Sequence, residues 1–333
     1  MAVLVLGGTQ FIGRHITQAL LAAGHEVTLF HRGRTNPDLF YVPQLTGDRD
    51  DQVGEGRNAL RDSGQTWDAC IDISGYVPRH VRDSAVLLAD RVGYYVFIST
   101  ISVYARPFQR GYTEAAPLQP IEHPESEAVG EHYGELKVIC ENEVRAAFGE
   151  RAALLRLGLV CGPWDHTDRV TYWVMRAAQG GRMLVPAAPD DPFQTVDARD
   201  IAAFTTHILG AQPHGPVNVV APPVTWREWL AACAAVTDAA SEPVWVDDER
   251  WLHDHTPQDT RPRGALPMFI PEENGPAWTA DNSRSVQWGA AYRPVADSVR
   301  AIHTWRTGQP DPLAAGLSPA QERAMLSAWG DRQ

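Results

Sequence analysis

Two residues with acid-base potential lie four positions apart in the stretch SEAVGEHYGELKVICENEV, namely Tyr133 and Lys137. At helical spacing both side chains project from the same face of the helix. A tyrosine, whose free pKa is about 10, can exchange a proton with a substrate oxygen near neutral pH if a nearby cation stabilises the phenolate. A lysine ammonium group supplies such a cation and can also hydrogen-bond a ribose. The pair is therefore a candidate acid with its activator.

The position of the lysine strengthens this interpretation. Lys137 is the single lysine of the chain, and all other residues among the 29 basic ones are arginines. Given nine tyrosines in the chain, the lysine would follow one of them at this spacing by chance only roughly 3% of the time. The alternative is that both residues belong to a solvated helix face, because Y-x-x-x-K alone is a weak pattern.

A third catalytic group is expected at the end of the apolar run YYVFIST. Open α/β sheets bind their ligands at the carboxyl ends of the strands, where Thr100 supplies a hydroxyl. Ser99 and Ser102 are the alternatives, and hydroxyl residues at strand ends also serve as turn formers.

A glycine-rich turn, GGTQFIG, follows the first apolar run and precedes a helical pattern. Glycines there allow a tight strand-to-helix turn and close approach of a pyrophosphate, which then meets the helix N-terminus. The turn predicts dinucleotide binding by the following residues: Gly7, Thr9, Gln10, Phe11, Ile12 and Gly13. Gln10 stands where a middle glycine is common, and the alternative is a βα turn without a ligand.

The end of the second predicted strand bears on the choice of dinucleotide. Enzymes that prefer NAD place a carboxylate there, whereas this chain reads Phe30-His31-Arg32-Gly33-Arg34. We therefore expect NADP, with NAD as the alternative, and assign His31 and Arg32 to the cofactor. The alternative is that these arginines belong to a solvated charged loop that binds no cofactor.

The elements that position these residues alternate between short apolar runs and amphipathic stretches over residues 2 to about 160. This pattern predicts an α/β fold with a Rossmann-type doubly wound parallel sheet. We assign residues 1–160 to the dinucleotide-binding domain and expect 193–221 to return to it. Residues 161–192 and 222–333 form a smaller, irregular substrate-binding region that is rich in proline and holds ten of the eleven tryptophans.

Composition limits the class of protein. The formal net charge is −12, which lacks the positive field that a nucleic-acid binder needs. The N-terminus leaves no room for a signal peptide or a membrane helix, and the four separated cysteines suggest neither a disulfide framework nor a metal site. We expect a cytoplasmic protein that binds a small-molecule substrate and no metal, nucleic acid or membrane, and a homodimer is left open.

The chain resembles the extended or atypical short-chain dehydrogenase/reductase superfamily, the NAD-dependent epimerase/dehydratase group, in the segments GGTQFIG, ISTISVY, YGELK, LRLGLVCGP and VDARDIA. The similarity spans residues 2 to about 210. It implies that Thr100, four residues before Tyr104, is the catalytic hydroxyl residue, and that Tyr133 and Lys137 are the Y-x-x-x-K pair. It also implies cofactor contacts from two further segments, Gly47-Asp48-Arg49 beside the adenine and Ile73-Ser74-Gly75.

Departures from the family pattern narrow the expected chemistry. Family 4,6-dehydratases carry an Asp-Glu pair after the catalytic threonine, where this chain has Ile101-Ser102, so dehydration of a nucleotide sugar is not expected. Leu159 and Gln194 replace an asparagine and an arginine of the nucleotide-sugar enzymes, which puts a diphosphate-sugar substrate in doubt. The resemblance implies NAD(P)-dependent reduction, oxidation or epimerisation at a hydroxyl or carbonyl carbon of a sugar-like or other small polar substrate.

The turn GGTQFIG and the segment GDRD are also similar to the atypical branch that contains chloroplast stem-loop-binding proteins. The alternative function is therefore a non-catalytic dinucleotide-binding or RNA-associated module. The retained Tyr133 and Lys137 and the net charge of −12 argue against that role.

Three other groups of residues have competing interpretations. The cluster from Asp165 to Arg169 lines a pocket or forms a solvated loop. The tryptophans at 164, 173, 226, 229 and 251 are expected to pack in a core. His132, like His31, is expected to have a surface or capping role more readily than to bind a metal.

Overall fold

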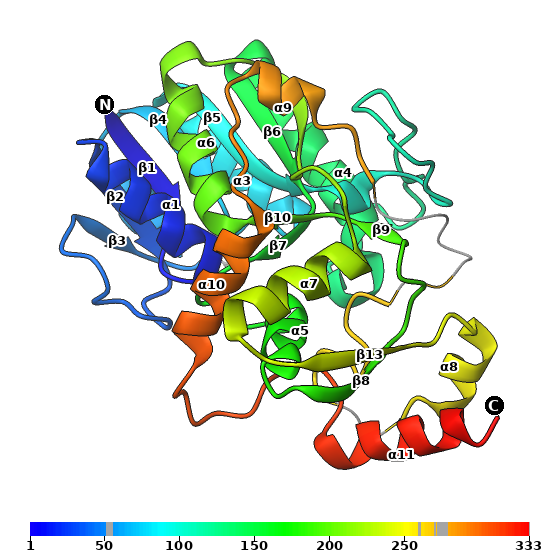
Figure 1. The fold of residues 1–333 in the computed structure, drawn as a ribbon. Helices are drawn as coiled ribbons and strands as arrows, with labels where there is room; N and C mark the ends of the chain where they lie inside the picture. The colour runs from blue at the N-terminus through cyan, green and yellow to red at the C-terminus, as the bar shows by residue number, and fades with distance from the viewer. Residues whose placement is uncertain (51–55, 259–260, 270, 272–278, 333) are drawn as a thin grey trace.

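A seven-stranded parallel sheet forms the main body of the protein in the computed structural model, which describes residues 1–333 except 51–55, 259–260, 270, 272–278 and 333 (Figure 1). The strand order is β11-β6-β5-β4-β1-β2-β3. Its strands are β1 (Ala2–Leu6), β2 (Glu26–His31), β3 (Gln44–Thr46), β4 (Trp67–Asp72), β5 (Val92–Thr100), β6 (Ala152–Leu157) and β11 (Gly215–Val219). The chain therefore has the doubly wound α/β fold that the alternating pattern predicts.

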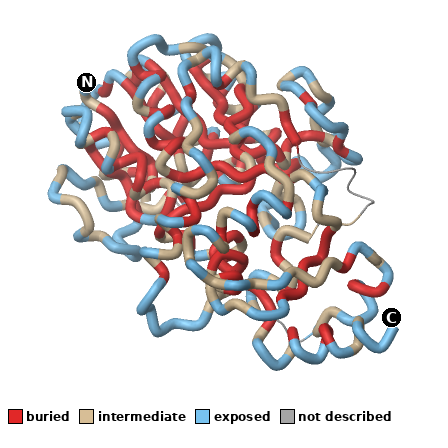
Figure 2. Tube along the Cα trace, viewed as in Figure 1, coloured by how far each residue is buried: buried red, intermediate tan, exposed pale blue. Residues whose placement is uncertain are grey.

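Helices cover both faces of this sheet (Figure 1). The helices α1 (Phe11–Ala22) and α6 (Ala198–Ala211) pack on one face, and α3 (Pro78–Leu88) and α4 (Val129–Phe148) pack on the other. Successive residues of a strand point to opposite faces, so Val3 and Val5 lie in the α1/α6 core while Leu4 and Leu6 lie in the α3/α4 core. Burial on both faces explains why these strands are continuous apolar runs, and Figure 2 shows them as the most buried part of the chain.

A second hydrophobic core lies outside the sheet, in the region that follows residue 158. Its elements are α5 (Arg169–Ala177), β8 (Gly181–Val185), β9 (Pro192–Phe193), β12 (Val224–Thr225), α7 (Trp226–Thr237), β13 (Ser241–Trp245), α8 (Glu249–His255), α10 (Val295–Arg306) and α11 (Pro319–Gly330). The strands β8 and β13 pair in parallel. Trp173, Trp226, Trp229 and Trp251 are buried in this core, as expected, whereas Trp164 is only half-buried and lies outside it, under the guanidinium of Arg14.

The chain crosses between the two cores more than once. The short strand β7 (Leu159–Cys161) pairs in parallel with β10 (Thr195–Asp197), and β10 leads into α6 and then into β11 at the edge of the main sheet. A later segment also returns, because α9 (Ser283–Gln287) contacts β11 and Ala290 lies in the α1/α6 core. The region from 222 to 333 is therefore divided between the two bodies in the structure, a return for which the sequence offered no apolar run.

The remaining elements are short or terminal. They are α2 (Asn58–Asp62), the 3-10 helix η1 (Ile101–Val103) and the 3-10 helix η2 (Gly149–Arg151). The terminal helix α11 starts with a capping box between Ser318 and Gln321, as the pattern LSPAQ predicts. Of the helices in the described residues, none is long and apolar enough to cross a membrane.

Candidate active site

The glycine-rich turn between β1 and α1 has the shape that a phosphate-binding turn needs. Gly7 and Gly8 have φ values of 106° and 100°, a region that disfavours residues with a side chain. A Cβ atom on Gly13 would lie 2.9 Å from the backbone N and Cα of Gly8, so the first turn of α1 can approach the loop only because Gly13 lacks a side chain. Gln10 is the N-cap residue, and the helix dipole favours an anion there.

A cleft with a volume of about 400 Å³ opens at this turn and runs across the carboxyl ends of β1, β2 and β4. Ten residues assigned to the cofactor from the sequence line it: Gly7, Thr9, Gln10, Phe11, Ile12, His31, Arg32, Asp48, Arg49 and Ser74. The cleft is therefore built by the segments that the glycine turn and the family resemblance single out. Four other residues expected at the cofactor do not line it, namely Gly13, Gly75, Tyr133 and Lys137.

The end of β2 presents arginines to this cleft. His31 is held in place on both ring nitrogens, 2.9 Å from Oε1 of Gln44 and 2.9 Å from the backbone N of Gly33. This fixes the turn from which Arg32 and Arg34 reach the cleft, where Arg34 lies 3.7 Å from the carboxylate of Asp48. Arg32 is exposed, so its guanidinium is available to a ligand.

Besides lining the cleft, Arg49 has a structural role. Its guanidinium forms a two-pronged ion pair with the buried carboxylate of Asp72, at 2.6 and 2.9 Å, and its Nε donates to Ser84. Asp72 also accepts a hydrogen bond from the hydroxyl of Tyr95. Arg49 thus points into the protein and fixes the loop that carries Asp48, because an unpaired buried carboxylate at the end of β4 would be costly.

Lys137 also points inward. Its Nζ atom donates to the carbonyl oxygens of Gly75 and Ile98, at 2.8 and 2.7 Å, and lies 4.0 Å from the centre of the Phe97 ring. Burial lowers the pKa of Lys137 to about 8. The ammonium group therefore ties the loop after β4 to the end of β5, and two of its three N–H donors are used in doing so.

Tyr133 and Thr100 meet at the carboxyl end of β5. Burial raises the pKa of Tyr133 to about 12, against the lowering effects of the Thr100 hydroxyl and of the charge on Arg169. This differs from the expectation that Lys137 would be the cation that lowers the pKa of Tyr133. The lysine ammonium donates instead to two backbone carbonyl oxygens.

The two alternative hydroxyl residues are distinguished by their contacts. Ser99 donates at 2.6 Å to the buried carboxylate of Glu141, which is itself paired with Arg156 at 2.7 Å. Ser102 lies beside Thr100, whose Oγ1 accepts from the Ser102 backbone N and donates to its Oγ. Thr100 is therefore the hydroxyl group that faces Tyr133.

The segment after β7 forms a wall of the site against α1. His15 is hydrogen-bonded at 3.1 Å to the carbonyl of Pro163, and Arg14 lies over the ring of Trp164 at 3.6 Å. His166, from the polar cluster that follows Trp164, lines the cleft and packs edge-on against Phe11. Asp165 is buried instead, which raises the pKa of its carboxyl group.

One residue that the sequence did not single out links the cleft to the tyrosine. Tyr76 lines the cleft, and its ring centre lies 6.5 Å from that of Tyr133 and 5.6 Å from Nζ of Lys137. Val77 and His80 line the cleft beside it. The signal was present, because these residues follow the same strand end as Ser74.

Comparison with known proteins agrees with this geometry. A model of the NAD dependent epimerase/dehydratase family matches residues 3–221. The chloroplast stem-loop binding protein of 41 kDa b from Arabidopsis thaliana is 24% identical over 227 residues, which are 62% of this chain and 55% of that protein. This chain thus covers little more than half the length of that relative.

Two solved structures share the fold. The Bordetella bronchiseptica enzyme WbmH, solved in complex with NAD+, has a TM-score of 0.67 at 18% identity and covers 92% of this chain and 99% of its own. The UDP-glucuronic acid 4-epimerase of Bacillus cereus, solved in complex with NAD, has a TM-score of 0.67 at 14% identity and covers 95% and 100%. The glycine turn and the strand order agree with the family match, which covers most of the chain. This protein therefore belongs to the NAD-dependent epimerase/dehydratase family, within the extended short-chain dehydrogenase/reductases.

Proposed function

We propose that this protein is an NAD(P)-dependent oxidoreductase or epimerase that acts on a hydroxyl or carbonyl carbon of a small polar substrate. The observation that carries the proposal is that Tyr133 and Thr100 lie together at the strand edge that also holds the dinucleotide-type cleft, close enough for the Thr100 hydroxyl to lower the pKa of Tyr133. When bound, the nicotinamide supplies hydride acceptance and donation, and the remaining chemistry falls to the chain's own side chains.

Tyr133 is the group that exchanges a proton with the substrate oxygen. Thr100 is the second hydroxyl at that oxygen and lies beside the phenol group of Tyr133. Arg169, whose charge lowers the pKa of Tyr133, is the cation on the substrate side of the pair. Because Arg169 is the first residue of α5, the substrate region contributes directly to the reacting end of the cleft.

Lys137 acts in this proposal as a positioning and cofactor-binding residue. Its ammonium group joins Gly75 to Ile98 and so holds the ring of Tyr76 near Tyr133. The third N–H donor of the ammonium is the one that would hydrogen-bond a ribose hydroxyl.

The residues at the glycine turn fit a dinucleotide. The absence of a Cβ on Gly13 lets the helix start approach the backbone of Gly8, and the N-terminus of α1 favours the pyrophosphate. Arg32 and Arg34 at the end of β2 favour a ribose phosphate, as in NADP, whereas the two solved relatives hold NAD. We propose NADP, with NAD as the alternative.

The substrate is proposed only by class. One of the solved relatives is a UDP-glucuronic acid 4-epimerase, which supports a sugar-like substrate. The side chain of Gln194, however, has a structural role, because it is hydrogen-bonded to the backbone of Ala221 and Ala280. It also carries no charge that would attract a diphosphate. A polar substrate without a diphosphate suits this site better.

The test is a Tyr133→Phe variant assayed with NADPH or NAD on a panel of aldehydes, ketones and UDP-sugars. With the best substrate found, we expect kcat to fall by about 10²- to 10⁴-fold while the dinucleotide Kd is unchanged. Tyr41→Phe, at a fully exposed tyrosine, is the matched control and should retain full activity. Full turnover by Tyr133→Phe would refute the role of Tyr133.

RNA binding is the competing function, since the Arabidopsis relative is named for stem-loop binding. The net charge of −12 does not favour it. A thermal-shift comparison separates the two, because a ligand that binds the native state raises Tm. We expect a rise with NADP or NAD and none with an RNA hairpin, and the reverse pattern would favour RNA binding.

A further inference from the structure

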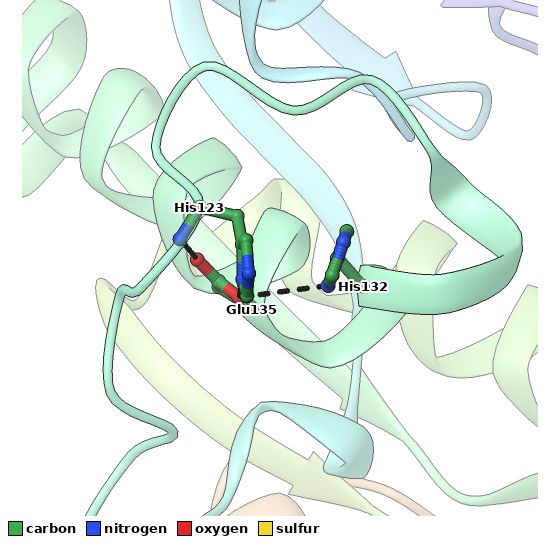
Figure 3. Close-up of side chains that lie close together, drawn as sticks. All are labelled: His123, His132 and Glu135. Carbon is green, nitrogen blue, oxygen red and sulfur yellow. Dashed lines mark hydrogen bonds and ion pairs between the residues drawn. The ribbon is translucent and has the colours of Figure 1, made fainter.

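Three side chains of metal-ligating type converge at the start of α4, next to Tyr133. His132 and Glu135 belong to the helix, and His123 belongs to the loop before it (Figure 3). The Nδ1 atom of His123 lies 3.1 Å from Oε2 of Glu135, and Nδ1 of His132 lies 4.0 Å from the same oxygen. One ligand atom from each residue lies within 4.8 Å of the other two, so the three residues surround a single point.

The backbone holds this arrangement in place. His132 has φ −118° and ψ 26°, which is non-helical inside α4, and its ring stacks on that of His123 with centres 4.1 Å apart. The Oε1 atom of Glu135 accepts a hydrogen bond from the backbone N of His123, which leaves Oε2 facing the two imidazoles. The three groups are therefore held close together before any ligand binds.

The charges favour a cation at this point. Glu135 is only 6% exposed, and its ion pairs within the described residues are formed with the two histidines. A buried carboxylate is costly unless a positive group compensates it. The exposed carboxylate of Glu131 lies 3.9 Å from Nε2 of His132 and adds negative charge beside that ring without a hydrogen bond.

We infer that His123, His132 and Glu135 bind a divalent transition-metal ion of the zinc class. Two imidazole nitrogens and one carboxylate oxygen are a ligand set that zinc accepts, with a fourth position left for water. Bonds of about 2.0–2.1 Å in a tetrahedron place ligand atoms roughly 3.3 Å apart. The 3.1 and 4.0 Å separations lie on either side of that value, and the two stacked rings must turn apart for a nitrogen of each to face the same ion.

Such an ion would fasten the loop before α4 to the helix that carries Tyr133 and Lys137. The same loop already contacts the end of β5, because Gln119 Nε2 donates to the carbonyl oxygen of Ser102 at 2.7 Å. A Cβ atom on Gly134 would overlap that carbonyl, so helix and strand end are in direct contact there. The metal therefore has a positioning role for the site rather than a part in hydride transfer.

The sequence alone predicted no metal site, and His132 was expected to have a surface role. The proposed ligands are at positions 123, 132 and 135, a spacing that matches no short Cys/His metal-binding motif. The break in helical backbone at His132, which turns its ring to His123, is a feature of tertiary structure.

The test uses the full chain, stripped with EDTA and titrated first with CoCl₂ and then with ZnCl₂. We expect one cobalt ion per chain with the visible absorption of a tetrahedral site and no thiolate charge-transfer band, since all four cysteines are buried and free. Zinc should displace the cobalt and raise Tm. These readouts do not depend on enzymatic activity, so they stand whether or not the proposed function is correct.

Variants locate the site. His123→Ala and Glu135→Gln should each weaken zinc binding by more than about 100-fold, beyond the 10- to 100-fold typical of losing an outer-sphere partner. Because Glu135 is buried and its variant can perturb folding, the half-exposed His123 is the decisive position. His253→Ala, at an exposed histidine of α8, is the matched control and should bind zinc as the unaltered chain does.

A second group, Asp50, His80 and Glu127, serves as the competing location. Loss of zinc binding in His80→Ala with retention in His123→Ala would overturn the inference. The absence of saturable binding of one cobalt or zinc ion by the unaltered chain would overturn it as well.

Discussion

Replacing Gly13 by alanine tests the close contact between α1 and the glycine turn. The new Cβ atom would lie 2.9 Å from the backbone N and Cα of Gly8 and 3.2 Å from its carbonyl carbon, and backbone atoms cannot rotate away as a side chain does. Forcing an extra carbon into packed structure costs about 1–3 kcal/mol. Alanine in a helix returns about 0.5–1 kcal/mol relative to glycine. The free energy of unfolding should therefore fall by up to about 2.5 kcal/mol.

The same change should weaken dinucleotide binding, because Gly8 must move and it lines the cleft. We expect the Kd for NADP, measured by calorimetry, to rise at least about tenfold, which is about 1.4 kcal/mol. Gly210→Ala is the matched control, since that glycine lies in α6 and a Cβ atom added to it would meet no heavy atom within 4 Å. It should raise the free energy of unfolding by at most about 1 kcal/mol. Equal urea denaturation curves and equal Kd values for the two variants would refute the contact.

Three further predictions concern the arginines and the lysine. Arg49→Leu should lower the free energy of unfolding, measured in urea, by about 3–5 kcal/mol, because it leaves the buried Asp72 carboxylate without its cation. The control is Arg300→Leu in the exposed pair with Asp297, which should change the free energy of unfolding by less than about 1 kcal/mol. Equal losses in the two variants would contradict the role of the buried pair. The double change Arg32→Ala and Arg34→Ala should raise the Kd for NADP at least about tenfold and leave the Kd for NAD nearly unchanged. Arg61→Ala, on the exposed end of α2, is the control. An equal rise in the Kd values of both dinucleotides would count against a contact with the ribose phosphate. Lys137→Arg should lower the free energy of unfolding by about 1–3 kcal/mol, because the larger guanidinium must fit between two carbonyl oxygens and the Phe97 ring. An unchanged Tm would show that this space accommodates the larger group without strain.

The main fold follows from sequence because buried parallel strands leave a direct signal. β1 is apolar at every position because helices cover both of its faces, and the same burial on two faces shapes β4 to β6. The later returns of the chain had no such signal. β13 pairs with β8 across more than fifty residues, and the return of Ala290 to the sheet core depends on contacts made only in the folded chain.

The place of the site was predictable, whereas the direction of its charged side chains was not. Strand ends of a parallel sheet share one edge, so Ser74 and Thr100 could be placed there from their positions in the sequence. Spacing put Lys137 on the same helix as Tyr133 but could not show that two backbone carbonyls hold its ammonium group. Arg49 is similar, because Asp72, its partner, lies on a different segment.

The most direct test of the central claim is a crystal structure of the full chain grown with NADP. The proposal predicts that the pyrophosphate lies at the turn from Gly7 to Gly13 and that the nicotinamide lies beside the hydroxyl groups of Tyr133 and Thr100. A dinucleotide bound at the turn with its nicotinamide directed away from Tyr133, or no dinucleotide in this cleft, would contradict it.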